Sequence, residues 1–576
     1  MRMMQIANWE LKLKLGVKNL SFRLKIIFLS LLAIFFISGL ALLYQIDQKI
    51  SIEIPAEGGA FREGILGTPR FVNPVLTISD ADKDLTSLIY SGLMRLGYNG
   101  LIPDLAEKYE ISEDELCYTF TLKPDLKWPD GKPLTSDDII FTIKQIQNPT
   151  TKSPKRGSWE SVNIEKIDER IIRFCLQKPY APFLENTTTG ILPYHLWKDL
   201  LPDQMPLSNF NIDAVGSGPY KIKNISRSSS GIITSYTLGR NENFALEDPY
   251  IKKIILNFYP SEKKLIEAYQ KGEIDNLSAL SPKDILKIKK DTSSLNTYLL
   301  PRVFAVFFNQ DNAPIFTDKN VRLALKLATD KEKIVREVLE NLGTAISSSI
   351  PPGSFGAIEF PNEFENFDET QIEEAKNLLF KAGWKLNDEE QILEKKTKNE
   401  TTKMEFSLST SNVPDLIQAA KLLKEMWEKL GANVNIKIYE TGDLEQEVIR
   451  SRDYHALLFG EVMGREPDAF AFWHSSQRND PGLNVALYAN ITVDALLQKA
   501  RATFDTKKRE EIYRNFQEEI NKDTPAVFLY SPYFIYLTKS NISGINQKSI
   551  TIPSERFSQI HKWYVNTKKV WKIFKN

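Results

Sequence analysis

The stretch EFSLSTSNVPDLIQAAKLLKEMWEKLGANVNIKIY, Glu405 to Tyr439, carries a strand pattern, a helix pattern and a second strand pattern in succession. Both EFSLST and VNIKIY alternate apolar and polar residues, as strands do. Between them, apolar residues recur at spacings of four, three, four and three: Leu416, Ala420, Leu423, Trp427 and Leu430. This spacing predicts an amphipathic helix, and Gly431 is the expected C-cap. Strand, helix and strand in this order favour parallel pairing and an α/β fold class.

The same alternation of strand and helix signals continues toward the N-terminus. CYTFTL, Cys117 to Leu122, predicts a strand, and WPDGKPL after it contains a Pro-Asp-Gly turn. TSDDIIFTIKQIQN then predicts a helix with Thr135 or Ser136 as N-cap and two carboxylates in its first turn. IIRFCL is another expected strand, and a further helix is expected around Val321 to Leu327.

Length and charge restrict the class of protein. The 576 residues are too many for one core, so two to four domains or lobes are expected. Formal net charge is zero, but residues 1–25 hold six basic residues and one acidic residue. Their net charge is therefore +5 and that of the remainder −5. A mildly acidic body without a basic stripe argues against nucleic-acid binding.

The basic head, residues 1–25, precedes IIFLSLLAIFFISGLALLY, residues 26–44, which contains no charge. As a helix these 19 residues rise about 28 Å, roughly one hydrocarbon core. A cleaved signal peptide is the alternative, but its apolar region is shorter and ends in small residues, whereas YQIDQKISIEIP comes next here. We expect an uncleaved transmembrane anchor, a cytoplasmic N-terminus and an extracellular or periplasmic body, joined by a linker at 45–57.

Residues that carry chemistry are few and scattered. The two cysteines, Cys117 and Cys175, lie in strand-like segments, where export permits a disulfide and two small buried thiols are the alternative. They and four dispersed histidines offer no zinc spacing. The sequence has no G-x-S-x-G elbow, no H-E-x-x-H helix and no P-loop. We therefore expect no cofactor, no metal site and no enzyme.

Several segments, in order, resemble the extracytoplasmic solute-binding proteins of ABC importers, in the oligopeptide, dipeptide and nickel class (family 5). The most specific is YTFTLKPDLKWPDGKPLTSDDIIFTI, which fits the pattern F-x-L followed by W-x-D-G-x-P-x-T-x-D-D. LGTPRFVNPVL, AVGSGPYKI with GRNENF, LIEAYQKGEIDNL and FFNQDNAPIFTDKNVRLALKLATDKEKIV are similar to further elements of that family. The resemblance covers about residues 60 to 540.

The resemblance implies a bilobed periplasmic-binding-protein-like fold with an extra domain in its N-terminal half. Mapped onto this chain, lobe I comprises residues 58–83, 199–300 and 530–576. The extra domain comprises 84–198 and lobe II comprises 301–529. Such lobes close on a solute and then dock on a permease, and exclusion of water between the lobes strengthens the polar contacts.

The implied function is capture of peptides and delivery to an ABC permease by a membrane-tethered protein, which we expect to be monomeric. A binder of a nickel complex, haem or sugar with the same fold is the first alternative. A sensor or surface interaction protein without a transport role is the second. An exported hydrolase that uses His474 with Asp468 or Glu466 is the third.

The stretch GREPDAFAFWHSSQRND, Gly464 to Asp480, is where the resemblance places the ligand. Peptide binders of the family put an aspartate about four residues before an E-P or D-P-D element, where it pairs with the peptide's α-amino group. Here the matching residue is Met463, so either Glu461 or Glu466 substitutes for the aspartate, or the ligand lacks a free amine at this place. The expected ligand-binding residues are Glu461, Glu466, Asp468, His474, Trp473 and Tyr220, of which Trp473 and Tyr220 have core positions as their alternative.

Overall fold

The computed structural model describes residues 21–98, 100–278, 280–288, 293–358, 360, 367–397, 400–539, 542–547 and 549–574. The chain divides into two compact units. The smaller unit joins the segment up to Gly58 to the segment from Tyr564 onward, and the larger unit spans Gly59–Trp563.

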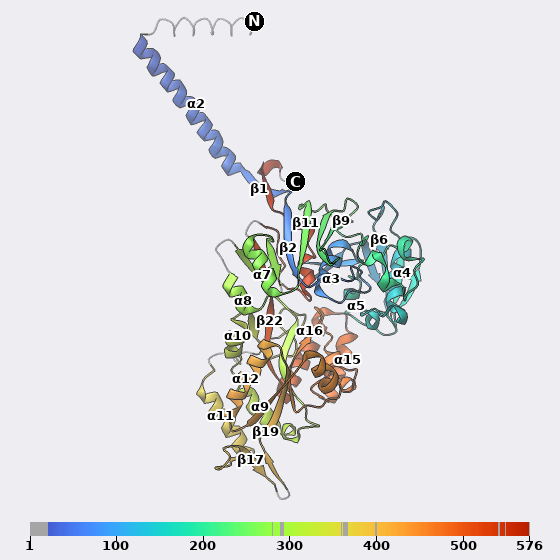
Figure 1. The fold of residues 1–576 in the computed structure, drawn as a ribbon, viewed down its shortest axis with the longest axis vertical. Coiled ribbons are helices and arrows are strands. Elements are labelled where there is room, and N and C mark those ends of the chain that lie inside the picture. The colour runs from blue at the N-terminus through green and yellow to red at the C-terminus, as the bar shows by residue number, and fades with distance from the viewer. Residues whose placement is uncertain are drawn as a thin grey trace. The chain divides into compact units, whose positions relative to one another are not determined.

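A twelve-stranded sheet forms the framework of the larger unit, in the order β20-β19-β21-β14-β22-β12-β2-β11-β10-β9, with β13 and β15 also paired to β22 (Figure 1). Its strands are β2 (Ala60–Leu66), β9 (Tyr220–Arg227), β10 (Ile233–Arg240), β11 (Lys253–Tyr259), β12 (Asn276–Ser278), β13 (Ser293–Leu299), β14 (Arg302–Phe308), β15 (Gly343–Ala345), β19 (Glu405–Ser411), β20 (Asn433–Tyr439), β21 (Ala456–Val462) and β22 (Ala526–Lys539). β22 belongs to both halves of this sheet, because its first residues pair with β14 and its last residues pair with β13.

The longer helices of the larger unit are α3 (Asp80–Ile89), α4 (Ser136–Gln147), α7 (Glu262–Lys271), α9 (Lys319–Leu327), α10 (Lys331–Leu339), α11 (Glu369–Lys381), α12 (Pro414–Glu428), α15 (Ile491–Arg501) and α16 (Thr506–Asp523). A π-helix, η6, covers Leu444–Ile449. π-Helical turns are rare and frequently occur at functional sites.

The strand-helix-strand unit predicted at Glu405–Tyr439 is confirmed. β19 and β20 pair in parallel from Glu405↔Asn433 to Ser411↔Tyr439, with α12 between them in the chain. All five residues of the predicted apolar face are buried: Leu416, Ala420, Leu423, Trp427 and Leu430. The C-cap residue is Lys429 and not the predicted Gly431, which lies two residues further and has a φ of +91°, a backbone conformation that suits glycine. This α/β packing supplies one core of the larger unit.

A separate four-stranded sheet, in the order β5-β6-β8-β7, lies in the N-terminal half of the chain. Its strands are β5 (Ala106–Ile111), β6 (Cys117–Leu122), β7 (Asn163–Lys166) and β8 (Ile171–Cys175). Cys117 and Cys175 face each other across β6 and β8 and form a disulfide, so the alternative of two free thiols is wrong. The helix predicted after this strand is α4, whose N-cap Thr135 completes a capping box with Asp138.

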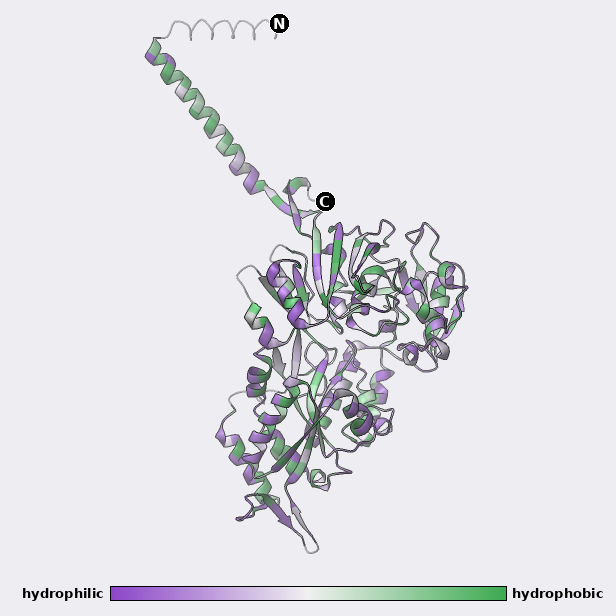
Figure 2. Ribbon diagram, viewed as in Figure 1, coloured by the Kyte–Doolittle hydropathy of each residue, from purple (hydrophilic) through white to green (hydrophobic). Residues whose placement is uncertain are grey.

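The smaller unit contains α2 (Phe22–Ile50), β1 (Ser51–Ala56) and β23 (Asn566–Trp571). Figure 2 shows α2 as an almost continuously hydrophobic helix, and its most apolar window is 0% buried. Residues 45–57, predicted to be a linker, contain secondary structure. The helix continues to Ile50, and β1 then pairs antiparallel with β23 from the far end of the chain. Residues 566–571, expected in lobe I, therefore belong to this smaller unit.

Candidate functional site

A cavity of about 230 Å³ lies against α3, and we call it the α3 cavity. Its walls come from segments far apart in the chain: α3 and the following hairpin, Lys155, Glu185 with Thr188, Arg465, and residues 551–558. In the proposed domain map these are lobe I, the extra domain and lobe II. The α3 cavity is thus walled by segments that the sequence prediction assigns to three different parts of the chain.

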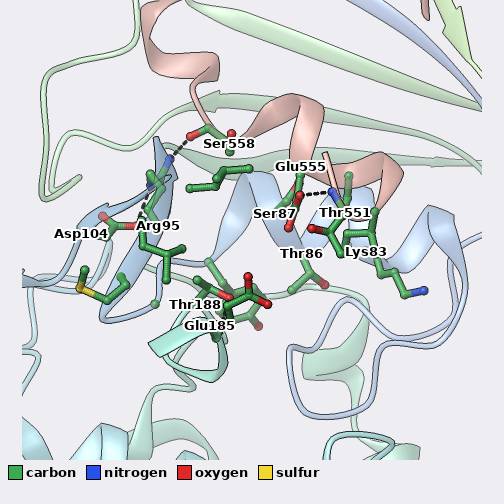
Figure 3. A pocket seen from close by; sticks show the side chains of 18 of the residues that line it. Lys83, Thr86, Ser87, Arg95, Asp104, Glu185, Thr188, Thr551, Glu555 and Ser558 are labelled. Atoms are coloured by element: carbon green, nitrogen blue, oxygen red, sulfur yellow. Dashed lines mark hydrogen bonds and ion pairs between the residues drawn. The ribbon is translucent and has the colours of Figure 1, made fainter. Parts of the chain in front are cut away.

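The walls of the α3 cavity carry charges of both signs. Burial raises the pKa of the Glu185 carboxyl to about 7, against a hydrogen bond from the Glu466 N–H and the charge of Arg465. Burial lowers the pKa of Lys155 to about 8, and the charge of Lys83 lowers it further. Figure 3 shows Glu185 and Thr188 across the cavity from Thr86 and Ser87 of α3. The cavity thus offers half-buried acidic and basic groups to a polar ligand.

A second cavity, of about 400 Å³, lies at the end of β21, and we call it the Glu461 cavity. It is lined by residues of the π-helix region, of the β21 end and of the loop after α14 (Phe470–Trp473): Glu445, Ile449, Arg450, Arg452, Phe459, Gly460, Glu461, Val462, Phe472, Asp480, Pro481, Gly482, Leu483 and Val485. β21 ends at Val462, so Glu461 lies next to the last residue of this strand. Four residues after Glu461, Arg465 lines the α3 cavity, so one segment borders both cavities.

Glu461 is the most unusual group in this cavity. Its side chain is buried, with 5% of the residue exposed. Neither carboxylate oxygen has a hydrogen-bond partner among the described residues. Burial alone raises the pKa of this carboxyl well above its ordinary value. A buried carboxylate without a partner is costly, so a cationic ligand group that reached it would gain a strong, water-shielded interaction.

The other two predicted acids are already paired. Glu466 forms an ion pair with Arg509 of α16, while its backbone N–H donates to Glu185 Oε1 at 3.0 Å. Asp468 accepts two hydrogen bonds from Arg501, at 2.8 Å from Nε and 2.5 Å from Nη2. It also accepts one from the Tyr180 hydroxyl at 3.4 Å. These two acids connect the stretch Glu466-Pro467-Asp468 to α15, to α16 and to the segment around residues 180–185.

Neighbouring contacts extend this connection. Arg465 Nη2 lies 2.8 Å from Glu555 Oε2, and the Ala181 N–H donates to the Arg501 carbonyl at 3.0 Å. Burial raises the pKa of Glu555, which the charge of Arg465 opposes. Residues 465–468, which follow β21, therefore link this side of the sheet to residues 180–185 and to Glu555.

The three remaining predicted residues are engaged inside the protein. His474 Nδ1 lies 2.9 Å from Ser476 Oγ and its Nε2 lies 3.0 Å from Gln498 Nε2, while its ring stacks on Phe470. Trp473 is fully buried in an apolar core, where it packs against Phe528, and Tyr220 is fully buried with its hydroxyl donating to the Ile251 carbonyl.

Met463, the residue at the position of the expected aspartate, is 1% exposed. Its N–H donates to the Pro301 carbonyl at 2.8 Å. Glu461 lies two residues earlier, within β21, and it is the acid of this segment whose two carboxylate oxygens have no partner in the described part of the chain.

The site residues predicted from the sequence do not include Lys155, Glu185, Arg465 and Glu555, which line the α3 cavity. Arg465 lies inside the stretch Gly464 to Asp480, and its position just before two acids could have marked it as a site residue. The other three lie in unrelated segments without a spacing pattern, and the fold alone brings them together.

Comparison with known proteins identifies the class of protein. Residues 100–482 match the bacterial extracellular solute-binding proteins, family 5. The chain belongs to this family, so the family and the α/β fold class predicted from its motifs are confirmed.

Individual relatives cover most of the chain. Oligopeptide-binding protein AppA of Bacillus subtilis (strain 168) is 27% identical over 530 residues, 90% of this chain and 94% of its own. A dipeptide-binding protein of Escherichia coli (strain K12) is 26% identical over 492 residues, 80% of this chain and 87% of its own. The structure of Bacillus subtilis AppA in complex with a nonapeptide has 26% identity and a TM-score of 0.67, and covers 89% of this chain and 100% of that one.

Proposed function

We propose that this solute-binding protein captures peptides between two lobes and delivers them to an ABC permease, while a membrane helix holds it at the extracellular face of the cell membrane. The single observation that carries peptide capture is Glu461, a buried carboxylate that faces a cavity and lacks a partner among the described residues. The relatives named for oligopeptides and dipeptides support the same ligand class.

The proposed role of Glu461 is to pair with the α-amino group of the peptide. It takes the place of the aspartate that the family resemblance implies at Met463. Glu466 and Asp468 keep their arginine partners, so their proposed role changes from ligand contact to support of the site. Backbone groups of the site bind the rest of the peptide, which allows many sequences to be accepted.

The proposed lobes follow the sheet. Lobe I holds the strands from β9 to β13 with β2, and lobe II holds β14, β15 and β19 to β21. β22 passes from one to the other. The charged α3 cavity, walled by both lobes and the extra domain of this map, is proposed as the part of the site that changes when the lobes move.

The membrane tether is supported by α2 and by the strand directly after it. The helix continues six residues beyond Tyr44 and leads directly into β1, which pairs with β23. A cleavage site needs an extended, accessible segment after the apolar run, and this chain has helix there. Fractionation of cells with an intact-mass measurement tests the tether: the full chain is expected in the membrane fraction, and a soluble product trimmed near residue 44 would contradict it.

Thermal unfolding with di- to octapeptides, nickel-histidine and haem tests the ligand class. A ligand at 100 times its dissociation constant adds about 2.7 kcal/mol to the free energy of unfolding. We expect this stabilisation from peptides, which are recovered uncleaved, because binding is the proposed activity. Stabilisation by haem or nickel-histidine alone would contradict the peptide assignment, and cleavage of the peptides would contradict the non-enzymatic one.

A further inference from the structure

The C-terminal strand β23 lies beside β1 and the last turn of α2 (Figure 1). β23 pairs antiparallel with β1, and Trp571 lies opposite Ser51, the residue directly after α2. The Trp571 indole N–H donates to Asp47 Oδ1 at 2.8 Å. Lys569 Nζ lies 3.5 Å from Gln48 Oε1. These contacts join the last turn of α2 to the last strand of the protein.

The position of these contacts along α2 sets their depth in a membrane. The uncharged run ends at Tyr44, and Asp47 lies three residues further, about 4.5 Å along the helix axis. The headgroup layer on each side of the hydrocarbon core is roughly 5–7 Å thick. Asp47 therefore falls within that layer when α2 spans the membrane. Because the Trp571 indole is hydrogen-bonded to Asp47, it falls there as well.

The composition of residues 566–574 suits this depth. The segment carries three lysines and no acid, and all three are exposed: Lys568, Lys569 and Lys572. β1 contributes one acid, Glu53, opposite Lys569, so the paired strands with residues 572–574 keep a net positive charge. Trp571 is 46% exposed and Ile573 is 78% exposed. Tryptophan favours the membrane interface, and juxtamembrane lysines favour anionic lipids.

We propose that residues 566–574 form a second membrane contact that binds the anionic phospholipid headgroups of the leaflet in which α2 ends. This inference rests on the proposed tether. The aromatic and aliphatic side chains of Trp571 and Ile573 enter the interface, while the lysines contact phosphate groups. The N- and C-terminal segments then hold the protein to the membrane at two points of one small unit.

The test uses the full chain in nanodiscs that contain a headgroup-nitroxide lipid. A fluorophore is attached at Ile573→Cys, with Ile491→Cys, which is 86% exposed in the larger unit, as the matched control. With 30% phosphatidylglycerol we expect at least twofold stronger quenching at position 573 than at position 491. Equal quenching at both positions would overturn the inference.

Charge variants separate lipid binding from mere proximity. In the Lys568→Glu, Lys569→Glu, Lys572→Glu variant, quenching at position 573 is expected to fall to its value in pure phosphatidylcholine. The matching triple arginine variant is expected to retain it. Quenching that ignores both lipid charge and these substitutions would overturn headgroup binding. Co-elution of the chain with nanodiscs and its intact mass report on the tether separately: an anchored chain with an unquenched label refutes only the second contact.

Discussion

Replacement of Glu461 by glutamine tests the proposed ammonium site most specifically. The substitution keeps the size and shape of the side chain and removes its charge. Because Glu461 is 5% exposed and already desolvated in the folded protein, pairing with an ammonium group gains energy that water screens little. A charge-assisted hydrogen bond in such a place contributes about 2–3 kcal/mol. We therefore expect Glu461→Gln to weaken binding of a free-amine peptide about 30- to 150-fold.

Isothermal titration with one peptide, free and N-acetylated, completes a double-mutant cycle. The acetylated peptide is expected to bind both proteins with nearly equal affinity. Pairing also lowers the raised pKa of Glu461, so binding of the free peptide is expected to release a proton in the wild type and none in the variant.

Glu445→Gln is the matched control, because Glu445 lines the same cavity but is exposed. An exposed charge contributes about 0–1 kcal/mol, so this variant is expected to change affinity little. Loss of affinity in Glu461→Gln that is equal for free and acetylated peptides would refute the ammonium contact.

Further predictions concern pH and stability. Burial raises the pKa of Glu461 in the folded, empty protein above its unfolded-state value near 4.5, so the wild type loses stability as pH rises above 4.5. Chemical denaturation should therefore find Glu461→Gln more stable than the wild type at pH 8 and equally stable at pH 4. A stability difference that does not depend on pH would contradict this. Asp468→Asn weakens an ion pair and should cost about 1 kcal/mol of unfolding free energy while changing peptide affinity less than about threefold; abolished binding would return it to the ligand site. Cys117→Ala with Cys175→Ala opens a link across a separation of 58 residues, which the chain-entropy model values at about 4 kcal/mol; calorimetry that finds an unchanged transition would contradict it. Thr135→Ala removes an N-cap and should cost about 1 kcal/mol in the same measurement, whereas no loss would show that the capping box is dispensable.

Local patterns predicted the secondary structure well. The alternation in EFSLST and the helical spacing from Leu416 to Leu430 depend on neighbours within one or two turns, so β19 and α12 appear as expected. The helix start at Thr135 was readable for the same reason, because a capping box involves residues three apart.

Contacts between residues far apart in the chain could not be predicted from the sequence. Glu466 and Asp468 looked like ligand contacts, but Arg509 and Arg501 lie more than 30 residues along the chain. The contact of Glu466 with Glu185 spans 281 residues. Whether a carboxylate has a hydrogen-bond or ion-pair partner depends on every residue around it in the folded protein. The fold is therefore needed to know that Glu466 is paired and that Glu461 has no partner among the described residues. The pairing of β1 with β23 likewise depends on where the chain returns.

Native mass spectrometry tests peptide capture through a free amino terminus most directly. The full chain is released from membranes without denaturation and incubated with a mixed di- to octapeptide library. Half of the library carries N-acetyl groups, and nickel-histidine and haem are added as competitors. We expect bound masses that correspond to peptides with free amino termini, with their acetylated counterparts depleted. Bound masses of haem or nickel-histidine alone, or equal capture of free and acetylated peptides, would contradict the proposed function.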